Sequence, residues 1–289
     1  MPKSLIVYFS QMGSTEKVAK AIAAGLRSGG YETTFLDLKH GLAVELGQYE
    51  LLGIGSPVFN YNQPFNVVDF LESLPGLNEK GTFLFNTFGT YKFDADAVLI
   101  KLATNKGAKV LGYFACRGYD SFLGYAKLGH LFSQDHPDAK DLGAAEEFGR
   151  KIAGVPTGDF ILKTTVSTRS RAPIIYKIER LATNRWLSAE IYSRFFKLSE
   201  TKCTGCKLCA RICPTSNIDS NELGQPLWQR HCIGCLMCEM RCPHDAIRSP
   251  VADWAVFRPF LEHNIRAALK DSSIEHVRVK HLNGRIIRA

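Results

Sequence analysis

The chain has 289 residues, of which 45% are hydrophobic, and a formal net charge of +8. This length allows two domains, with a substantial core in the larger one. No apolar run approaches the ~20 residues of a membrane-spanning helix, and no secretory leader pattern is present, so we expect a cytoplasmic protein without a transmembrane segment.

The charge is distributed unevenly along the chain. Residues 1–154 hold 15 Lys and Arg against 16 Asp and Glu, whereas residues 155–289 hold 21 against 12. The basic half favours an acidic docking partner, although a solvated basic surface explains the excess equally well. Its basic residues are scattered among acidic and apolar positions, which argues against nucleic-acid binding.

The first 154 residues alternate between strand and helix patterns. An apolar run at 5–9 ends in a polar loop at 10–15, and apolar residues then recur at helical spacing. Further strands are predicted at 33–38, 51–55, 82–86 and 109–115, with helices between them. Such alternation predicts a doubly wound parallel sheet that is covered by helices on both faces.

Ligands of a doubly wound sheet lie at the carboxyl ends of its strands, so the loops that follow four of these strands should form one pocket. The first loop is typical of a phosphate site, because Ser10, Ser14 and Thr15 flank Gly13 at a helix start. Ser and Thr are also ordinary N-caps. The other loops carry aromatic side chains that can stack on a flat ring, although a single aromatic is more often a core residue. The expected cofactor contacts are Ser10, Gln11, Met12, Gly13, Ser14, Thr15, Ser56, Pro57, Val58, Phe59, Asn60, Tyr61, Thr87, Phe88, Gly89, Thr90, Tyr91, Arg117, Gly118, Tyr119 and Asp120.

Cys116 is the only cysteine before position 203, and we interpret it as a small buried hydrophobe. Between 155 and 202 the pattern becomes helical. Pro173 is predicted to open a helix, and an apolar face follows at Trp186, Ile191, Phe195 and Phe196. This face is expected to cover the small cysteine-rich module that begins near residue 201, and contact with a membrane surface is the alternative.

Two further features are predicted near the C-terminus. Residues 251–270 have the pattern of a helix bearing Trp254, Phe257, Phe260 and Leu261. Asn283-Gly284 is a hairpin-turn dipeptide.

The other eight cysteines form two copies of one pattern, Cys-x2-Cys-x2-Cys-x3-Cys-Pro, which is the bacterial spacing for a pair of 4Fe–4S clusters. The first three cysteines of a run hold one cluster, and the fourth reaches across to the other. Zinc knuckles or a disulfide framework are the alternatives, but zinc sites use longer separations or histidine. We therefore assign one cluster to Cys203, Cys206, Cys209 and Cys242, and the other to Cys232, Cys235, Cys238 and Cys213.

The loop at 8–15 resembles the FMN-phosphate loop of flavodoxins, and the segment that starts His136-Pro137-Asp138 resembles the beginning of their last helix. Together with the double cysteine pattern, the chain resembles the flavodoxin–ferredoxin fusion proteins of anaerobic bacteria and archaea. Met12 departs from that family, which usually has a hydroxyl residue there. The resemblance implies FMN, strand order 2-1-3-4-5, and an α+β ferredoxin-like domain with two clusters.

We therefore expect a flavodoxin-like domain at 1–154, a helical linker at 155–200, a ferredoxin-like domain at 201–250, and a C-terminal helix and tail at 251–289. The expected function is electron transfer between FMN and two clusters, in exchange with redox proteins such as an acidic ferredoxin or flavodoxin. A flavin-dependent reductase of a small substrate, and a redox sensor or assembly factor, are the alternatives. The sequence contains no catalytic dyad or triad that requires an enzyme, and it does not predict the oligomeric state.

Overall fold

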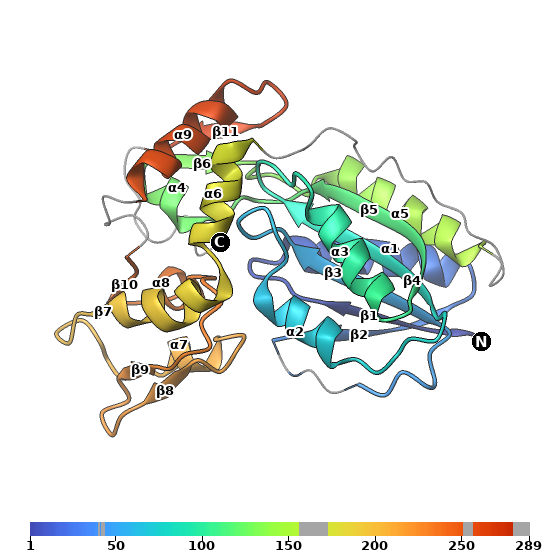
Figure 1. Cartoon of the computed structure of the whole chain (residues 1–289), viewed down its shortest axis with the longest axis horizontal. Helices are drawn as coiled ribbons and strands as arrows, with labels where there is room; N and C mark the ends of the chain where they lie inside the picture. The colour runs from blue at the N-terminus through green and yellow to red at the C-terminus, as the bar shows by residue number, and fades with distance from the viewer. Residues whose placement is uncertain (40, 42–43, 156–172, 251–256, 280–289) are drawn as a thin grey trace. The chain divides into compact units, whose positions relative to one another are not determined.

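The computed structural model describes residues 1–39, 41, 44–155, 173–250 and 257–279 (Figure 1). Contacts divide the chain into two compact units, Met1–Tyr119 with Asp135–Pro173 and Asp120–Gln134 with Ile174–Ala289. The second unit therefore includes a short segment from the middle of the chain as well as the cysteine-rich part.

The first unit contains a five-stranded sheet in the order β2-β1-β3-β4-β5. Every neighbouring pair of strands is parallel. The strands are β1 (Lys3–Tyr8), β2 (Glu32–Asp37), β3 (Leu51–Pro57), β4 (Gly81–Phe88) and β5 (Lys109–Arg117). The predicted flavodoxin-like sheet and its strand order are confirmed.

Helices cover both faces of this sheet. Figure 1 shows α2 (Phe65–Ser73) and α3 (Ala95–Asn105) on one side, and α1 (Ser14–Ser28) and α5 (Ala139–Ala153) on the other. Successive side chains of a strand point to opposite faces. Ile6 therefore joins the core under α1 and α5, whereas the equally buried Leu5 points to the opposite face.

The second unit is built from short elements. Its strand pairs are antiparallel: β6 (His130–Phe132) with β11 (His276–Arg278), β7 (Lys197–Leu198) with β10 (Ile247–Arg248), and β8 (Ile218–Ser220) with β9 (Pro226–Trp228). Its α-helices are α4 (Leu123–Lys127), α6 (Ile174–Ala182), α7 (Leu208–Arg211), α8 (Met237–Met240) and α9 (Arg258–Leu269). A π-helical turn at Leu187–Ile191 and a 3-10 turn at Tyr192–Phe195 follow α6. This unit has the α+β character that the resemblance implies.

The helices predicted outside the sheet domain are present. The helix predicted to open at Pro173 is α6, and the one predicted within 251–270 is α9, which has a proline in its first turn. Trp254 and the Asn283-Gly284 turn lie outside the described residues. Among the helices described, none has both the length and the apolar character needed to span a bilayer.

Candidate functional site

The four loops that were predicted to share a pocket meet at one edge of the sheet, at the carboxyl ends of β1, β3, β4 and β5. The Val58 N–H donates to the Thr87 carbonyl (2.8 Å), and the Gly118 N–H donates to the Phe88 carbonyl (3.0 Å). The hydroxyl oxygens of Thr15 and Thr87 lie 2.8 Å apart. Because every contact joins two different loops, the loops form one continuous rim.

The loop before α1 presents an anion site. Ser10 is buried, and its Oγ accepts the N–H groups of Gly13 (3.1 Å) and Glu16 (3.2 Å), which closes the loop. Gly13, the N-cap residue of α1, has φ 96° and provides no side-chain cap for the first turn. Ser10 takes the N–H of Glu16, while the backbone N–H groups at a helix start and the positive end of the helix dipole attract an anion. The loop therefore fits the phosphate of FMN.

The fourth loop holds the first and third loops in place. A Cβ added to Gly118 would lie 2.8 Å from Ser14 Cβ and 3.4 Å from Thr87 Cβ, so only glycine fits there without displacement. The Arg117 guanidinium donates to the carbonyls of Gly89 (3.0 Å) and Thr90 (2.9 Å). The described hydrogen bonds of Arg117 thus order the loop at 87–93.

Aromatic residues of the second and third loops pack partly against one another. Phe59 lies edge-on to Phe9, with ring centroids 5.9 Å apart. Tyr61 lies edge-on to Phe93 (5.0 Å), and Tyr91 stacks on the same ring (5.4 Å, 18° between planes). Tyr61 is only 6% exposed. Phe59 and Tyr91 are half-buried and so retain ring surface for a planar ligand.

The structure places three other expected cofactor contacts as follows. Ser56 is buried and donates its hydroxyl to the Pro57 carbonyl (2.9 Å). The Tyr119 N–H donates to the His136 carbonyl (2.8 Å), which ties the fourth loop to the segment before α5. Asp120 is the first residue of the short segment that belongs to the second unit.

Four cysteines of the second unit line one pocket. They are Cys203, Cys206, Cys209 and, from the other run, Cys242. Cys213, which ends the first run, is not among the lining residues.

A second group of thiols lies around Cys213. Burial raises the pKa of the Cys232 thiol to about 11, with a further contribution from the nearby charge of Cys213. Burial likewise raises the pKa of Cys235 and of Cys238, and Cys213 again adds to it. Iron binds thiolates, and a bound metal ion removes the thiol proton outright. Four thiols that lie close together, three of them with a pKa raised by burial, therefore have the chemistry of a metal-cluster site.

The two runs share one local backbone. Gly205 and Gly234 precede the second cysteine of their runs, with φ values of 66° and 70°. Lys207 and Leu236 follow that cysteine, and both have φ 57°. The fourth cysteines match too. The Asn217 N–H donates to Cys213 Sγ (3.2 Å), and the Ala246 N–H donates to Cys242 Sγ (3.3 Å). Donors aimed at sulfur stabilise its thiolate form. The sequence repeat is thus a structural repeat.

Trp228 shows how well the second group fits a thiolate-bound cluster. Its indole nitrogen is buried, and among the described residues it makes no hydrogen bond of ordinary geometry. The Trp228 side chain packs against the hydrophobic cluster that contains Cys238, and its N–H lowers the pKa of that thiol, against the larger effect of burial. A neutral thiol is a weak acceptor, whereas a cluster-bound thiolate is a strong one. Cluster binding would therefore satisfy a buried donor that the free thiol leaves almost unsatisfied.

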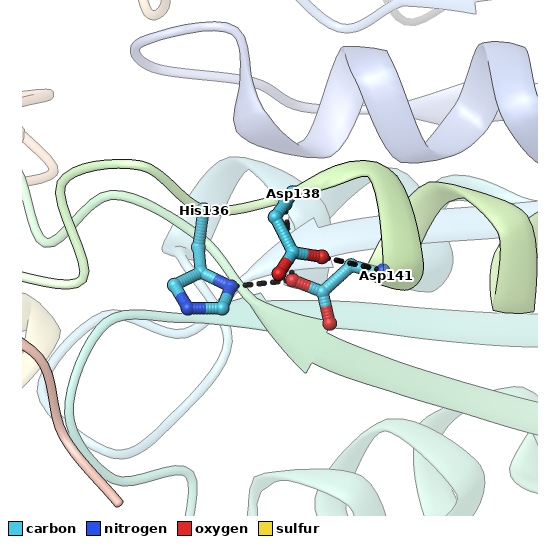
Figure 2. A group of neighbouring side chains, drawn as sticks. All are labelled: His136, Asp138 and Asp141. Atoms are coloured by element: carbon cyan, nitrogen blue, oxygen red, sulfur yellow. Dashed lines mark hydrogen bonds and ion pairs between the residues drawn. The ribbon is translucent and has the colours of Figure 1, made fainter.

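Another group of potential metal ligands lies at the start of α5, where Figure 2 shows the His136 ring beside the carboxylate of Asp141. Asp138 accepts the Asp141 N–H (2.8 Å), and the Asp141 side chain accepts the Asp138 N–H (3.1 Å). This reciprocal pair is a capping box. His136 Nδ1 lies 2.5 Å from Asp141 Oδ2. The group is explained as a helix cap, at the place where the sequence predicted the last helix to begin.

Two residues outside the predicted sites have clear places. Cys116 is buried in the core under α1 and α5, and burial raises its pKa far above the usual range, as expected for a structural cysteine. Trp228 was not predicted as a site residue. The sequence could have indicated this residue, because Trp228 lies four positions before Cys232 in a short cysteine-rich module. A buried indole N–H needs an acceptor, and the nearby sulfur atoms can provide one.

Two family models match different parts of the chain. A family model described as "Flavodoxin domain" matches residues 5–121, and one described as "4Fe-4S dicluster domain" matches residues 202–247. An uncharacterized protein of Methanocaldococcus jannaschii is 32% identical over 153 residues, which cover 52% of this chain and 97% of the relative. An NAD(P)H dehydrogenase (quinone) of Brucella melitensis is 27% identical over 201 residues, covering 54% of this chain and 97% of that protein.

Among solved structures, a flavodoxin from the domain Archaea aligns with 52% of this chain and 96% of its own, with a TM-score of 0.41 and 21% identity. The flavodoxin domain implies FMN, and the 4Fe-4S domain implies iron–sulfur chemistry, so the chain has the parts of an electron-transfer protein. Because both domains share one polypeptide, the chain is a flavodoxin–ferredoxin fusion.

Proposed function

We propose that this protein relays electrons between two 4Fe–4S clusters and one FMN, and so couples one-electron and two-electron carriers in anaerobic metabolism. When bound, the clusters supply one-electron transfer, and the flavin supplies transfer of one or two electrons. The observation that carries the proposal is the division of eight cysteines into two groups of four, with Cys242 joining the first group and Cys213 the second.

The two cysteine groups differ in their access to solvent. Cys206 of the first group is exposed, whereas Cys238 of the second group is buried. Electron transfer between proteins requires close approach, so the first group is the better contact for a soluble redox partner. Lys202 and Lys207 are exposed on either side of Cys206 and favour an acidic partner, such as an acidic ferredoxin or flavodoxin.

The first test is the content of the protein purified without oxygen. We expect about one FMN and about eight irons with matching sulfide for each chain. Two mononuclear zinc ions in place of iron would contradict the cluster assignment. Absence of FMN, with no uptake of added FMN, would contradict the flavin site.

The second test is the relay itself. A one-electron donor is mixed rapidly with the loaded protein, and the cluster and flavin absorption bands are followed together. Joining the centres in one chain raises their effective concentration, so the flavin should be reduced through the clusters. Cys206→Ala with Cys235→Ala should slow flavin reduction by about tenfold or more.

Cys116→Ala is the matched control, because Cys116 lies outside both cysteine groups. It should leave the rate unchanged if FMN content is normal. Flavin reduction that proceeds equally fast without clusters would show that the centres serve separate purposes, and the relay proposal would fail.

A second candidate function, reduction of a small quinone at the flavin, is supported by the name of the Brucella melitensis relative. Steady-state turnover with a soluble quinone separates the two functions. Rapid multiple turnover at a low quinone concentration would favour a reductase, whereas slow single-turnover oxidation would favour the electron carrier.

A further inference from the structure

One face of α6 is anchored within the second unit. Tyr176 is 4% exposed, and its ring lies edge-on to that of His263, with centroids 5.9 Å apart. Asn264 Nδ2 donates to Glu179 Oε2 (2.8 Å) in a buried contact. Both partners belong to α9, so these two contacts determine which side of α6 faces inward.

The opposite side of α6 carries large apolar side chains in contact with solvent. Ile174 is 76% exposed, Ile178 50% and Leu181 71%. Their spacing of four and three residues places them on one face of the helix, and we call these three residues the α6 stripe. Trp186 follows five residues later and is 62% exposed. Single exposed apolar residues are ordinary, but a group of them on one helix face marks an interaction site.

The charges around the α6 stripe are positive. Residues 173–186 contain Lys177, Arg180 and Arg185 and a single acidic residue, Glu179. Glu179 lies on the inner face, and burial raises the pKa of its carboxyl group. Lys177 and Arg185 are exposed. The solvent side of this segment therefore combines apolar and basic residues without an acidic one.

We propose that the α6 stripe and Trp186 insert into the headgroup region of an anionic lipid bilayer, with α6 lying in the plane of the surface. An apolar face, a basic rim and an aromatic residue are the features of helices that bind such surfaces. Lys and Arg near an anionic bilayer add attraction that apolar contact alone does not provide. The proposal goes beyond electron transfer and does not depend on it.

A lipid surface fits these residues better than a protein partner does. A stable protein interface buries about 800 Å² on each side, which is more than three aliphatic side chains and one indole supply. A bilayer sets no such threshold, because each inserted side chain contributes separately and binding can be weak and reversible. A helix that lies in the bilayer surface does not need to cross the bilayer. This agrees with the finding that none of the described helices could span a membrane.

The test uses the complete protein with its cofactors, kept free of oxygen, and two kinds of vesicle. One kind is pure phosphatidylcholine, and the other contains roughly one third phosphatidylglycerol. We expect the protein to float with the anionic vesicles at low salt, and to bind neutral vesicles about tenfold less. Binding should weaken in 0.5 M salt, because the Debye length falls to about 4 Å and salt screens the attraction of the basic residues to the anionic lipid.

The decisive variant is Ile178→Glu with Leu181→Glu, which places two carboxylates in the α6 stripe. It should lower the partition onto anionic vesicles by about tenfold or more. Leu223→Glu is the matched control, because Leu223 is 74% exposed in a different part of the second unit. It should bind like the unaltered protein. Spectra of the bound cofactors report whether each variant is folded.

Trp186 provides a second readout that does not depend on the charge variant. Lipids brominated near the headgroup should quench part of the tryptophan emission, and Trp186→Phe should abolish that quenching. Failure of the unaltered protein to bind anionic vesicles would overturn the proposal. Equal binding by the double variant, equal binding to neutral vesicles, or an α6-dependent dimer without vesicle binding would also overturn it.

Discussion

Thr15 and Thr87 are 72 positions apart in the sequence, and their hydroxyl oxygens lie 2.8 Å apart in a buried contact. Thr15 is in the first turn of α1, next to the proposed phosphate loop, and Thr87 is near the end of β4. The pair therefore connects the loop that would bind the phosphate to the loop that would contact the flavin ring. Its geometry allows one hydroxyl to donate to the other while the second donates to a ligand.

Replacement of Thr15 by valine tests this arrangement. Thr15→Val keeps the shape but removes the hydroxyl, so one hydrogen bond near the phosphate is lost. We expect the dissociation constant of FMN to rise about tenfold, which corresponds to ~1.4 kcal/mol. Fluorescence titration of the flavin-free protein measures it. Thr104→Val, at an exposed position at the end of α3, should leave FMN affinity unchanged; equal affinities for both variants would contradict the assignment.

If the fourth cysteine of each run binds the cluster of the other run, replacing that cysteine should damage the other run's cluster. Cys242 lines the pocket of Cys203, Cys206 and Cys209, so Cys242→Ala should remove or degrade that cluster, although Cys242 ends the other run. Cys213→Ala should instead affect the cluster of the second run. Iron content and electron paramagnetic resonance of each reduced variant identify the affected centre. The reverse pattern, with each variant damaging the cluster of its own run, would rule out crossing.

The sheet and the cysteine groups could be predicted from the sequence because local patterns encode them. The strand at 5–9 and the helix after it differ in hydrophobic period, and the ligand spacing in each cysteine run places three thiols on one loop. Predicted strands at 51–55 and 82–86 agree with β3 and β4 to within a few residues at their ends. Local signals of this kind do not require knowledge of distant contacts.

Pairings between distant short segments could not be predicted in this way. β6 has three residues, and its partner β11 lies nearly 150 positions later, at the end of the described chain, so neither carries a distinct strand pattern. The inward contact of Trp228 with Cys238 likewise depends on the pairing of β8 with β9. For α6, the sequence predicted an amphipathic helix but not which of its residues would remain exposed, because that depends on the contacts with α9.

Trp228 should influence the potential of the second cluster. Its N–H lowers the pKa of the nearby Cys238 thiol, and a donor close to a ligand sulfur stabilises the reduced, more negatively charged cluster. Trp228→Phe retains an aromatic ring beside Phe196, which stacks on Trp228 with centroids 5.4 Å apart, but removes the donor. We expect the reduction potential of that cluster to become more negative by roughly 50 mV. A shift of about 59 mV corresponds to a tenfold change in a one-electron equilibrium.

Potentiometric titration with paramagnetic resonance detection measures both clusters in one sample. Trp186→Phe is the control, because Trp186 is exposed and lies outside the cysteine groups. Its two cluster potentials should equal those of the unaltered protein. A Trp228→Phe variant with unchanged potentials and full cluster content would show that the indole only fills space.

The buried pair of Glu179 and Asn264 should make stability depend on pH. Asn264 Nδ2 donates to the Glu179 carboxylate, while Asn264 Oδ1 has no hydrogen-bond partner among the described residues. Burial raises the pKa of Glu179, since the charged form loses its solvation. A carboxyl whose pKa is raised on folding stabilises the fold below its unfolded pKa of about 4.5 and loses that contribution as pH rises through the folded value.

Glu179→Gln should therefore stabilise the protein at neutral pH. The glutamine oxygen can accept from Asn264 Nδ2, and its amide can donate to the unpaired Asn264 Oδ1, without a buried charge. We expect a gain of about 1–2 kcal/mol at pH 8 that shrinks as the pH is lowered, because Glu179 itself takes up a proton and its buried charge is lost. Thermal unfolding across this pH range, followed by circular dichroism without oxygen, measures the difference. Glu262→Gln is the control, because Glu262 is a partly exposed residue of α9 in surface ion pairs. It should shift stability by less than about 1 kcal/mol at every pH. A variant of Glu179 that is less stable at pH 8 would mean that the ionised carboxylate supports the fold.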